Sequence, residues 1–270
     1  MPPRGNVASC DIRGASPGSR ELELLDVARK LTEVHAILLT GGSAFGLAAA
    51  DGVMSWLEER GIGYETPVNV VPIVPTAVVF DLGSGNPSAR PNAESGRAAC
   101  DSAVENDVPV GRVGAGTGCT VGKLGGFEFS SPGGLGIASA TEGDWTASAL
   151  AVVNAVGDVV DENGKVVAGS TAPSASFDPP PFGNGDMQNT VLAVVAVNAA
   201  LDKPGAKWLA ARGSDGITVS VRPAHTRYDG DVAFAVAAPG PAVGPRDLDV
   251  LGFLATKAVA GAVRNAVRPS

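Results

Sequence analysis

The chain has 270 residues, 44% of them hydrophobic, which is enough to bury one large core or two modest ones, and we expect a single domain over 1–270. Its formal net charge of −8 argues against a nucleic-acid partner, because phosphate backbones bind clustered Lys and Arg and the sequence has no such cluster. The start lacks the apolar core of a signal peptide, and no run of about eighteen apolar residues is free of Gly, Pro or charge, so we expect a cytoplasmic protein without a membrane partner.

The first half of the chain predicts short strands and two helices. Residues 35–40 form an apolar run typical of a buried strand, and the apolar positions that follow share one helical face up to Gly61. A proline-interrupted stretch over 68–82 predicts extended chain, and 93–104 predicts a short helix. Glycine recurs every few residues over 110–136, which favours tight turns over regular structure.

The second half predicts further strands and a final helix. Residues 149–154 are an apolar run, and Asn163-Gly164, a dipeptide preferred in hairpin turns, separates two short valine pairs. Three more strands are expected, at 191–197, 218–221 and 232–236. An alanine-rich stretch with helical apolar spacing predicts a helix over 246–267. Strands and helices alternate without a strict βαβ rhythm, which suits a mixed α/β (α+β) fold.

A long irregular segment leads directly into one of these strands. Residues 169–188 are rich in Pro, Ser, Gly and Asp without periodicity, so we expect an exposed, mobile loop. The dipeptide Asn189-Thr190 stands where this loop meets the buried strand at 191–197. It combines a hydroxyl nucleophile with a labile preceding amide, and a junction of this kind suits autoproteolysis.

The glycine-rich run at 113–123 suggests a phosphate loop but matches neither nucleotide fingerprint. A P-loop requires Gly where Thr117 stands and Ser or Thr where Leu124 stands, and the dinucleotide pattern requires Gly at Cys119. We therefore expect no nucleotide cofactor. Lys123, in a glycine-lined pocket, can lose its charge through desolvation or stabilise a nearby anion, although an exposed lysine is the simpler interpretation.

The positions of the histidines, cysteines and carboxylates argue against a nucleophile elbow, a disulfide framework and a metal site. The two histidines, His35 and His225, lie outside any nucleophile-elbow context, and the three cysteines are widely spaced and expected to be reduced. No metal-ligand spacing occurs, so we expect no metal. Asp229 and Asp231 lie two apart, so on extended chain their carboxylates face the same side and repulsion perturbs the pKa of at least one, unless both are solvated in a turn.

Several segments occur together in an informative order: 41–47, 114–118, Lys123, 150–154, Asn189-Thr190, 223–226 and 229–231. In this order they resemble the P1 peptidase family, the DmpA-like L-aminopeptidase/D-esterase group (peptidase family S58), which is related to 6-aminohexanoate-oligomer hydrolases. The resemblance implies an αββα sandwich, in which two packed mixed sheets are flanked by helices. Such a fold resembles N-terminal nucleophile hydrolases with different strand connectivity.

The same resemblance implies a self-processing hydrolase without a cofactor. The Thr190 hydroxyl would attack the Asn189 carbonyl, giving fragments 1–189 and 190–270 and a free α-amino group on Thr190. That amine, with a pKa of about 8 when unperturbed, suits a general base, and the hydroxyl would then form an acyl-enzyme with small peptides or amino-acid amides and esters. The family also implies a homo-oligomer, tetrameric or larger.

Further site residues are implied by the family's motif. The Asn154 amide is matched to oxyanion stabilisation, Lys123 to the active site, and Asp229 with Asp231 to groups that orient the nucleophile. Phe45 falls in the substrate-binding region, where relatives commonly have a Tyr.

The chain departs from the family's pattern at two other places. Val191 replaces a second Thr, and relatives begin with an additional strand-turn-strand before Val7. A non-catalytic binding protein and an acyltransferase that uses the same acyl-threonine are the alternative functions.

Overall fold

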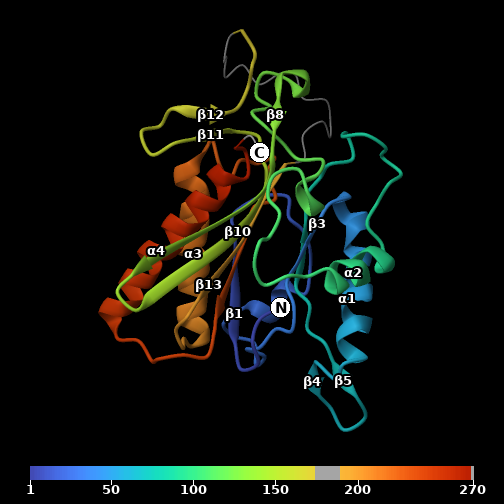
Figure 1. The fold of residues 1–270 in the computed structure, drawn as a ribbon, viewed down its shortest axis with the longest axis vertical. Coiled ribbons are helices and arrows are strands. Elements are labelled where there is room, and N and C mark those ends of the chain that lie inside the picture. The colour runs from blue at the N-terminus through green and yellow to red at the C-terminus, as the bar shows by residue number, and fades with distance from the viewer. Residues whose placement is uncertain (174–188, 269–270) are drawn as a thin grey trace.

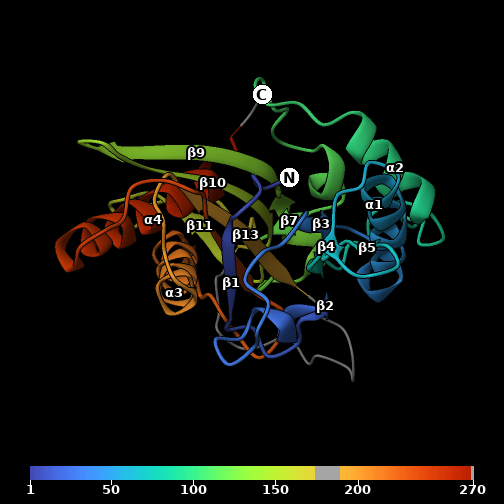
Figure 2. The same cartoon turned by 90° about the horizontal axis from the view of Figure 1, so that it is seen from below.

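A computed structural model describes residues 1–173 and 189–268, which form four layers (Figures 1 and 2). Helices α3 and α4 cover one face of a five-stranded sheet, the large sheet; a three-stranded small sheet faces its other side, and helices α1 and α2 lie outermost. The helices are α1 (Ala49–Glu58), α2 (Ala93–Asp101), α3 (Lys203–Ser220) and α4 (Pro245–Asn265). The expected αββα sandwich of two packed sheets flanked by helices is therefore confirmed.

Both sheets contain parallel and antiparallel pairs. The large sheet has the order β1 (Val7–Ile12), β15 (Val232–Ala237), β13 (Thr190–Val197), β10 (Trp145–Asn154) and β9 (Gly134–Glu142). In it β13 runs parallel to β15, and the other neighbours are antiparallel. The small sheet has the order β2 (Gly18–Arg20), β6 (Thr76–Val78) and β3 (Leu38–Thr40), with β3 parallel to β6.

The remaining strands pair in short ladders around this framework. They are β4 (Tyr64–Glu65) with β5 (Val70–Val71), β7 (Thr120–Val121) with β8 (Ser131–Pro132), and β11 (Asp158–Val160) between β12 (Val166–Ala168) and β14 (Val221–Arg222). No helix among the described residues is long and apolar enough to cross a membrane.

Alternation along the strands separates two cores. In β13, Val191, Ala193 and Val195 pack toward α3 and α4, whereas Leu192 and Val194 face the small sheet. We call this second side the inter-sheet face. By the same alternation Thr190, the first residue of β13, belongs to the inter-sheet face, and so the proposed nucleophile is presented between the two sheets.

Most predicted elements are present with shifted bounds. The strands expected at 35–40, 149–154, 191–197 and 232–236 correspond to β3, β10, β13 and β15, and the helices expected before Gly61, at 93–104 and at 246–267 correspond to α1, α2 and α4. The predicted hairpin forms between β11 and β12. Its connection is wider than two residues because the Asp161 carboxylate accepts hydrogen bonds from the backbone N–H of both Asn163 (2.9 Å) and Lys165 (2.8 Å).

The strand expected at 218–221 is wrong. Residues up to Ser220 belong to α3, and only Val221 and Arg222 are extended. Asp202 caps this helix by accepting a hydrogen bond from Gly205 N (2.8 Å), and Ile217 is fully buried against the large sheet. Helical packing and capping therefore override the strand preference of the β-branched residues at its end. Residues 174–188 of the predicted loop lie outside the described residues.

Candidate active site

Thr190, the expected nucleophile, and Asn154, whose amide is expected to stabilise the oxyanion, lie opposite each other at the ends of two neighbouring strands of the large sheet. Thr190 begins β13 and Asn154 ends β10, and the antiparallel register pairs them directly. Asn154, Asn189 and Thr190 are all buried. Two apolar strands with these bounds thus bring together residues that are far apart in the sequence.

The carbonyl group of Asn189 accepts hydrogen bonds from two directions. The Thr190 hydroxyl donates to the Asn189 carbonyl oxygen (2.5 Å), and the backbone N–H of Gly230 donates to the same oxygen (2.7 Å). The Asn189 N–H in turn donates to the Tyr228 carbonyl (3.1 Å), so the two segments form a short parallel bridge. A backbone donor on the carbonyl oxygen is the arrangement that stabilises an oxyanion formed by attack on that carbonyl.

Gly230 is held against Thr190 by tight packing. A Cβ atom on Gly230 would lie 2.9 Å from the Thr190 hydroxyl oxygen and 2.6 Å from the Ser16 carbonyl oxygen. The segment after β1 fixes this loop, since Gly14 N donates to the Asp231 carbonyl (3.2 Å) and Ser16 N donates to the Asp229 carbonyl (3.0 Å). The absence of a side chain at residue 230 therefore permits the close approach of its N–H to the Asn189 carbonyl.

Lys123 is buried beside both asparagines. Its Nζ donates to Asn189 Oδ1 (2.7 Å), to Asn154 Oδ1 (2.9 Å) and to the Asn154 carbonyl (3.2 Å). Three acceptors match the three N–H donors of an ammonium group. Burial nevertheless lowers the pKa of Lys123 to about 7, because it penalises the charged form. The amine is therefore poised to gain or lose a proton near neutral pH.

The shifted pKa of Lys123 predicts a pH dependence of stability. Between pH 7 and its ordinary value of 10.5 the unfolded chain holds a proton on Lys123 that the folded chain does not, so the free energy of unfolding rises with pH. In a Thr190→Ala background, which lacks the hydroxyl expected to attack the Asn189 carbonyl, we expect the stability difference between the parent and Lys123→Met to rise by up to about 1.4 kcal/mol per pH unit. Urea unfolding from pH 6 to 10 measures it. A difference independent of pH would contradict the buried, desolvated lysine.

Asp229 is a buried carboxyl group that titrates near neutral pH. It accepts hydrogen bonds from the Thr226 N–H (2.8 Å) and hydroxyl (2.6 Å), and from Val156 N (3.4 Å). Burial raises its pKa to about 6, and the charge of Asp231 adds to that increase. The repulsion expected from the two-residue spacing is therefore present.

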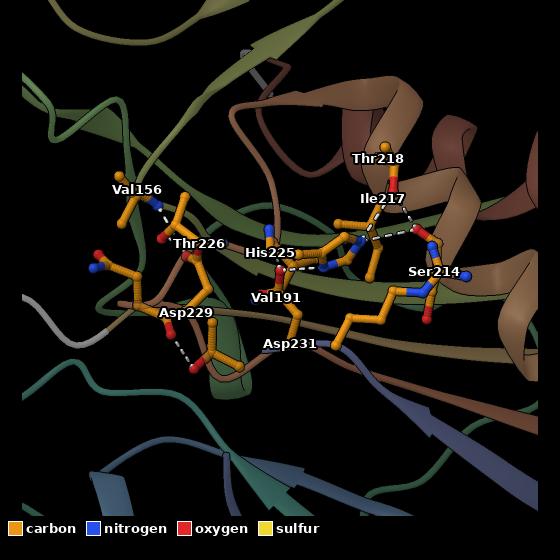
Figure 3. A network of polar contacts seen from close by, with 12 residues as sticks. Val156, Val191, Ser214, Ile217, Thr218, His225, Thr226, Asp229 and Asp231 are labelled. Carbon is orange, nitrogen blue, oxygen red and sulfur yellow. Dashed lines mark hydrogen bonds and ion pairs between the residues drawn. The ribbon is translucent and has the colours of Figure 1, made fainter. Parts of the chain in front are cut away.

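Asp231 connects the start of β13 with a histidine (Figure 3). One carboxylate oxygen accepts the backbone N–H of Val191 (2.6 Å), the residue after Thr190. The other oxygen accepts the ring Nδ1–H (2.8 Å) and the backbone N–H (3.1 Å) of His225. Neither His225 nor Gly230 is among the site residues expected from the sequence.

Asn154 and Phe45, two further residues expected from the sequence to act in the site, differ in how close they lie to Thr190. Asn154 donates through Nδ2 to the Phe80 carbonyl (2.8 Å), and the N–H on the Asn189 carbonyl oxygen comes instead from Gly230. Phe45 is 55% exposed, with the Arg90 guanidinium stacked 3.5 Å from its ring centre. The structure thus brings Lys123, Asn154 and Thr190 together and leaves Phe45 at the surface.

The thiol of Cys119 is a poor nucleophile, since burial raises its pKa to about 12. His35 accepts the Ile73 N–H through Nδ1 (3.0 Å), which is a structural contact. Among residues 1–173 and 189–268, no group of three or more His, Cys, Asp or Glu is arranged to hold a metal ion.

A cavity of about 1450 Å³ lies between the two sheets. Its walls include Leu150, Val152 and Val194 on the inter-sheet face, together with turns of the glycine-rich region. The cavity approaches the cluster at Thr120, whose backbone N–H donates to Asn154 Oδ1 (3.0 Å), although neither Asn154 nor Thr190 lines it. It therefore lies on the same side of the large sheet as Thr190.

Solved structures share this fold. A β-aminopeptidase from Burkholderia sp. superposes with a TM-score of 0.72 at 21% identity, over 97% of this chain and 73% of that chain. An L-aminopeptidase D-Ala-esterase/amidase from Ochrobactrum anthropi, described as a new variant among the N-terminal nucleophile hydrolase fold, has a TM-score of 0.70 at 21% identity, over 97% and 72%. The chain therefore shares the fold of these two proteins.

The family model described as peptidase family S58 matches residues 2–269, so the chain belongs to this family of peptide-bond hydrolases. An uncharacterized aminopeptidase of Mycobacterium tuberculosis is 42% identical over 91% of this chain and 74% of its own length. A 6-aminohexanoate-oligomer endohydrolase of Agromyces sp. is 31% identical over 75% of this chain and 60% of its own length. The family resemblance noted from the sequence motifs is confirmed.

Proposed function

We propose that the chain is a self-processing hydrolase that cuts its own Asn189–Thr190 bond and then uses Thr190 as an N-terminal nucleophile. The observation that carries this proposal is the pair of hydrogen bonds on the Asn189 carbonyl oxygen, one from the Thr190 hydroxyl and one from Gly230 N–H. A nucleophile and an oxyanion donor thus face the same carbonyl group, in a chain that belongs to a peptidase family.

Self-cleavage then follows an N-to-O acyl shift. The Thr190 oxygen bonds to the Asn189 carbonyl carbon while negative charge develops on the oxygen that Gly230 contacts. The C–N bond breaks, and the peptide nitrogen takes the proton that the hydroxyl loses. Water hydrolyses the resulting ester, leaving a carboxylate on Asn189 and a free amine on Thr190.

The processed enzyme repeats this chemistry on a substrate. The new amine, with an unperturbed pKa of about 8, takes the proton of the Thr190 hydroxyl as the hydroxyl attacks an amide carbonyl. The substrate C–N bond then breaks, and the amine of Thr190 returns this proton to the leaving amine. Water hydrolyses the acyl-threonine ester, which releases the acid and restores the hydroxyl. The cavity between the sheets offers apolar walls for the acyl group, and Lys123 and Asn154 lie on the same face of the large sheet. The names of the relatives favour small peptides, amino-acid amides or esters, and ω-amino-acid oligomers as substrates.

Intact mass spectrometry of the purified wild-type protein tests the proposal. Two fragments that together equal 26.9 kDa plus one water, the smaller beginning Thr-Val-Leu, are the expected result, with hydrolysis of amino-acid p-nitroanilides by the cleaved protein. A single uncut chain without hydrolysis would indicate a non-catalytic binding protein. Product that forms only with an added amine acceptor would indicate acyl transfer from the same acyl-threonine.

A further inference from the structure

His225 bridges the site and helix α3. On one side its Nδ1 contacts Asp231 Oδ2 at 2.8 Å. On the other side its Nε2 lies 3.0 Å from the Thr218 hydroxyl and 3.3 Å from the Ser214 carbonyl oxygen. Its side chain is 13% exposed, so the ring fills the space between the loop before β15 and the helix (Figure 3).

The acceptors around this ring favour a doubly protonated imidazole. With both nitrogens protonated, Nδ1–H donates to the Asp231 carboxylate and Nε2–H donates to the Thr218 hydroxyl, which itself donates to the Ser214 carbonyl (3.1 Å). In the neutral form with its proton on Nδ1, Nε2 becomes an acceptor, and the single Thr218 proton must choose between His225 and Ser214. The imidazolium therefore allows all three hydrogen bonds, to Asp231, to Thr218 and from Thr218 to Ser214, to form at once.

We propose that His225 is a positioning residue that holds the Asp231 carboxylate against Val191 N–H and so fixes Thr190 for attack. The inference rests on the proposed self-cleavage. One oxygen of Asp231 is held by His225 and the other by Val191, whose nitrogen is bonded to the Thr190 carbonyl carbon. A rotation of the carboxylate therefore moves the first peptide of β13, and the nucleophile with it.

The charges around His225 support this ion pair. Burial alone lowers the pKa of His225, but the hydrogen bond and charge of Asp231 outweigh it, and the net pKa is raised. Arg13, on the segment after β1, opposes the imidazolium, but its guanidinium is bound to Asp215 of α3 (2.8 Å) and to Asp11 (2.9 Å). Asp229 adds a second carboxyl close to Asp231.

The backbone of His225 allows two informative substitutions. Its φ is +55°, a left-handed conformation that Gly and Asn tolerate better than other residues. His225→Asn keeps an N–H donor that does not titrate, and His225→Gly removes the side chain without backbone strain. His35→Asn is the matched control, because His35 makes a structural contact far along the chain from this network.

Cleavage of precursor made by cell-free translation, followed on gels from pH 5.5 to 9, tests the role. We expect His225→Gly to cleave about 100-fold more slowly than wild type and to regain cleavage with added imidazole, because small misplacements of a nucleophile cost rates of this order. His225→Asn should retain most of the rate at high pH. The ratio of wild-type to His225→Asn rates should be largest in acid and fall as the imidazolium deprotonates, whereas His35→Asn should match wild type.

Three outcomes separate this inference from the function on which it rests. Wild-type rates and pH profile in His225→Gly would overturn the positioning role while leaving self-cleavage intact. The positioning role would also be overturned if His225→Gly cleaves slowly without rescue by imidazole and the ratio of wild-type to His225→Asn rates does not change with pH. His225 would then act only through packing. Failure of the wild-type chain to cleave would instead overturn the proposed function.

Discussion

Replacing Thr190 with alanine is expected to leave a single uncut chain of 26.9 kDa and to abolish amide hydrolysis. The substitution removes the only hydroxyl that contacts the Asn189 carbonyl oxygen among the described residues. Loss of a serine-hydrolase nucleophile lowers turnover on the order of 10⁶-fold, and a comparable loss is expected here because the same atom acts in both reactions. Intact mass spectrometry and p-nitroanilide hydrolysis measure the two effects.

Thr190→Ser is the matched control for this variant. It keeps the hydroxyl and removes one methyl group from a site that is 4% exposed, so cleavage should continue. Persistent cleavage in Thr190→Ala would point to Asn189 itself, whose side-chain Nδ2 is buried and has no hydrogen-bond partner among the described residues. An Asn189→Ala variant distinguishes that route, because alanine has no side-chain amide that could attack its own carbonyl.

The sequence predicts in part that Thr190 and Asn154 lie close together. The apolar runs at 149–154 and 191–197 read as strands, and the family motif places one candidate at the end of the first and the other just before the second. Antiparallel pairing of such strands puts both residues at the same edge of a sheet. The sequence predicts the burial of Lys123 less directly. That burial depends on backbone hydrogen bonds from Gly122 N to the Gly157 carbonyl and from Lys123 N to the Val156 carbonyl.

Gly230 and His225 could not be identified in the same way. The contribution of Gly230 is a backbone N–H, which every residue except proline has, and only the fold decides which N–H meets the Asn189 carbonyl. His225 depends on α3, which supplies Ser214 and Thr218. Because residues 218–221 were expected to form a strand, the helix partner of His225 was absent from the expected site.

Gly230→Ala is the second substitution with a large expected effect. The added Cβ would lie 2.9 Å from the Thr190 hydroxyl oxygen and 2.6 Å from the Ser16 carbonyl, so the loop must move and carry its N–H away from the Asn189 carbonyl. Removal of one oxyanion donor costs about 10²- to 10³-fold in rate, and we expect self-cleavage to slow by at least that factor. The cleavage rate of freshly translated precursor measures it.

Gly213→Ala controls for adding a methyl group elsewhere in the buried structure. At this position in α3 the nearest atoms lie 3.5 Å away, an ordinary contact, and alanine favours a helix over glycine by up to about 1 kcal/mol. This variant should fold at least as stably as wild type and cleave at the wild-type rate. A folded Gly230→Ala chain that also cleaves at the wild-type rate would show that Gly230 N–H does not stabilise the oxyanion, and would leave the Asn154 amide as the donor to test next.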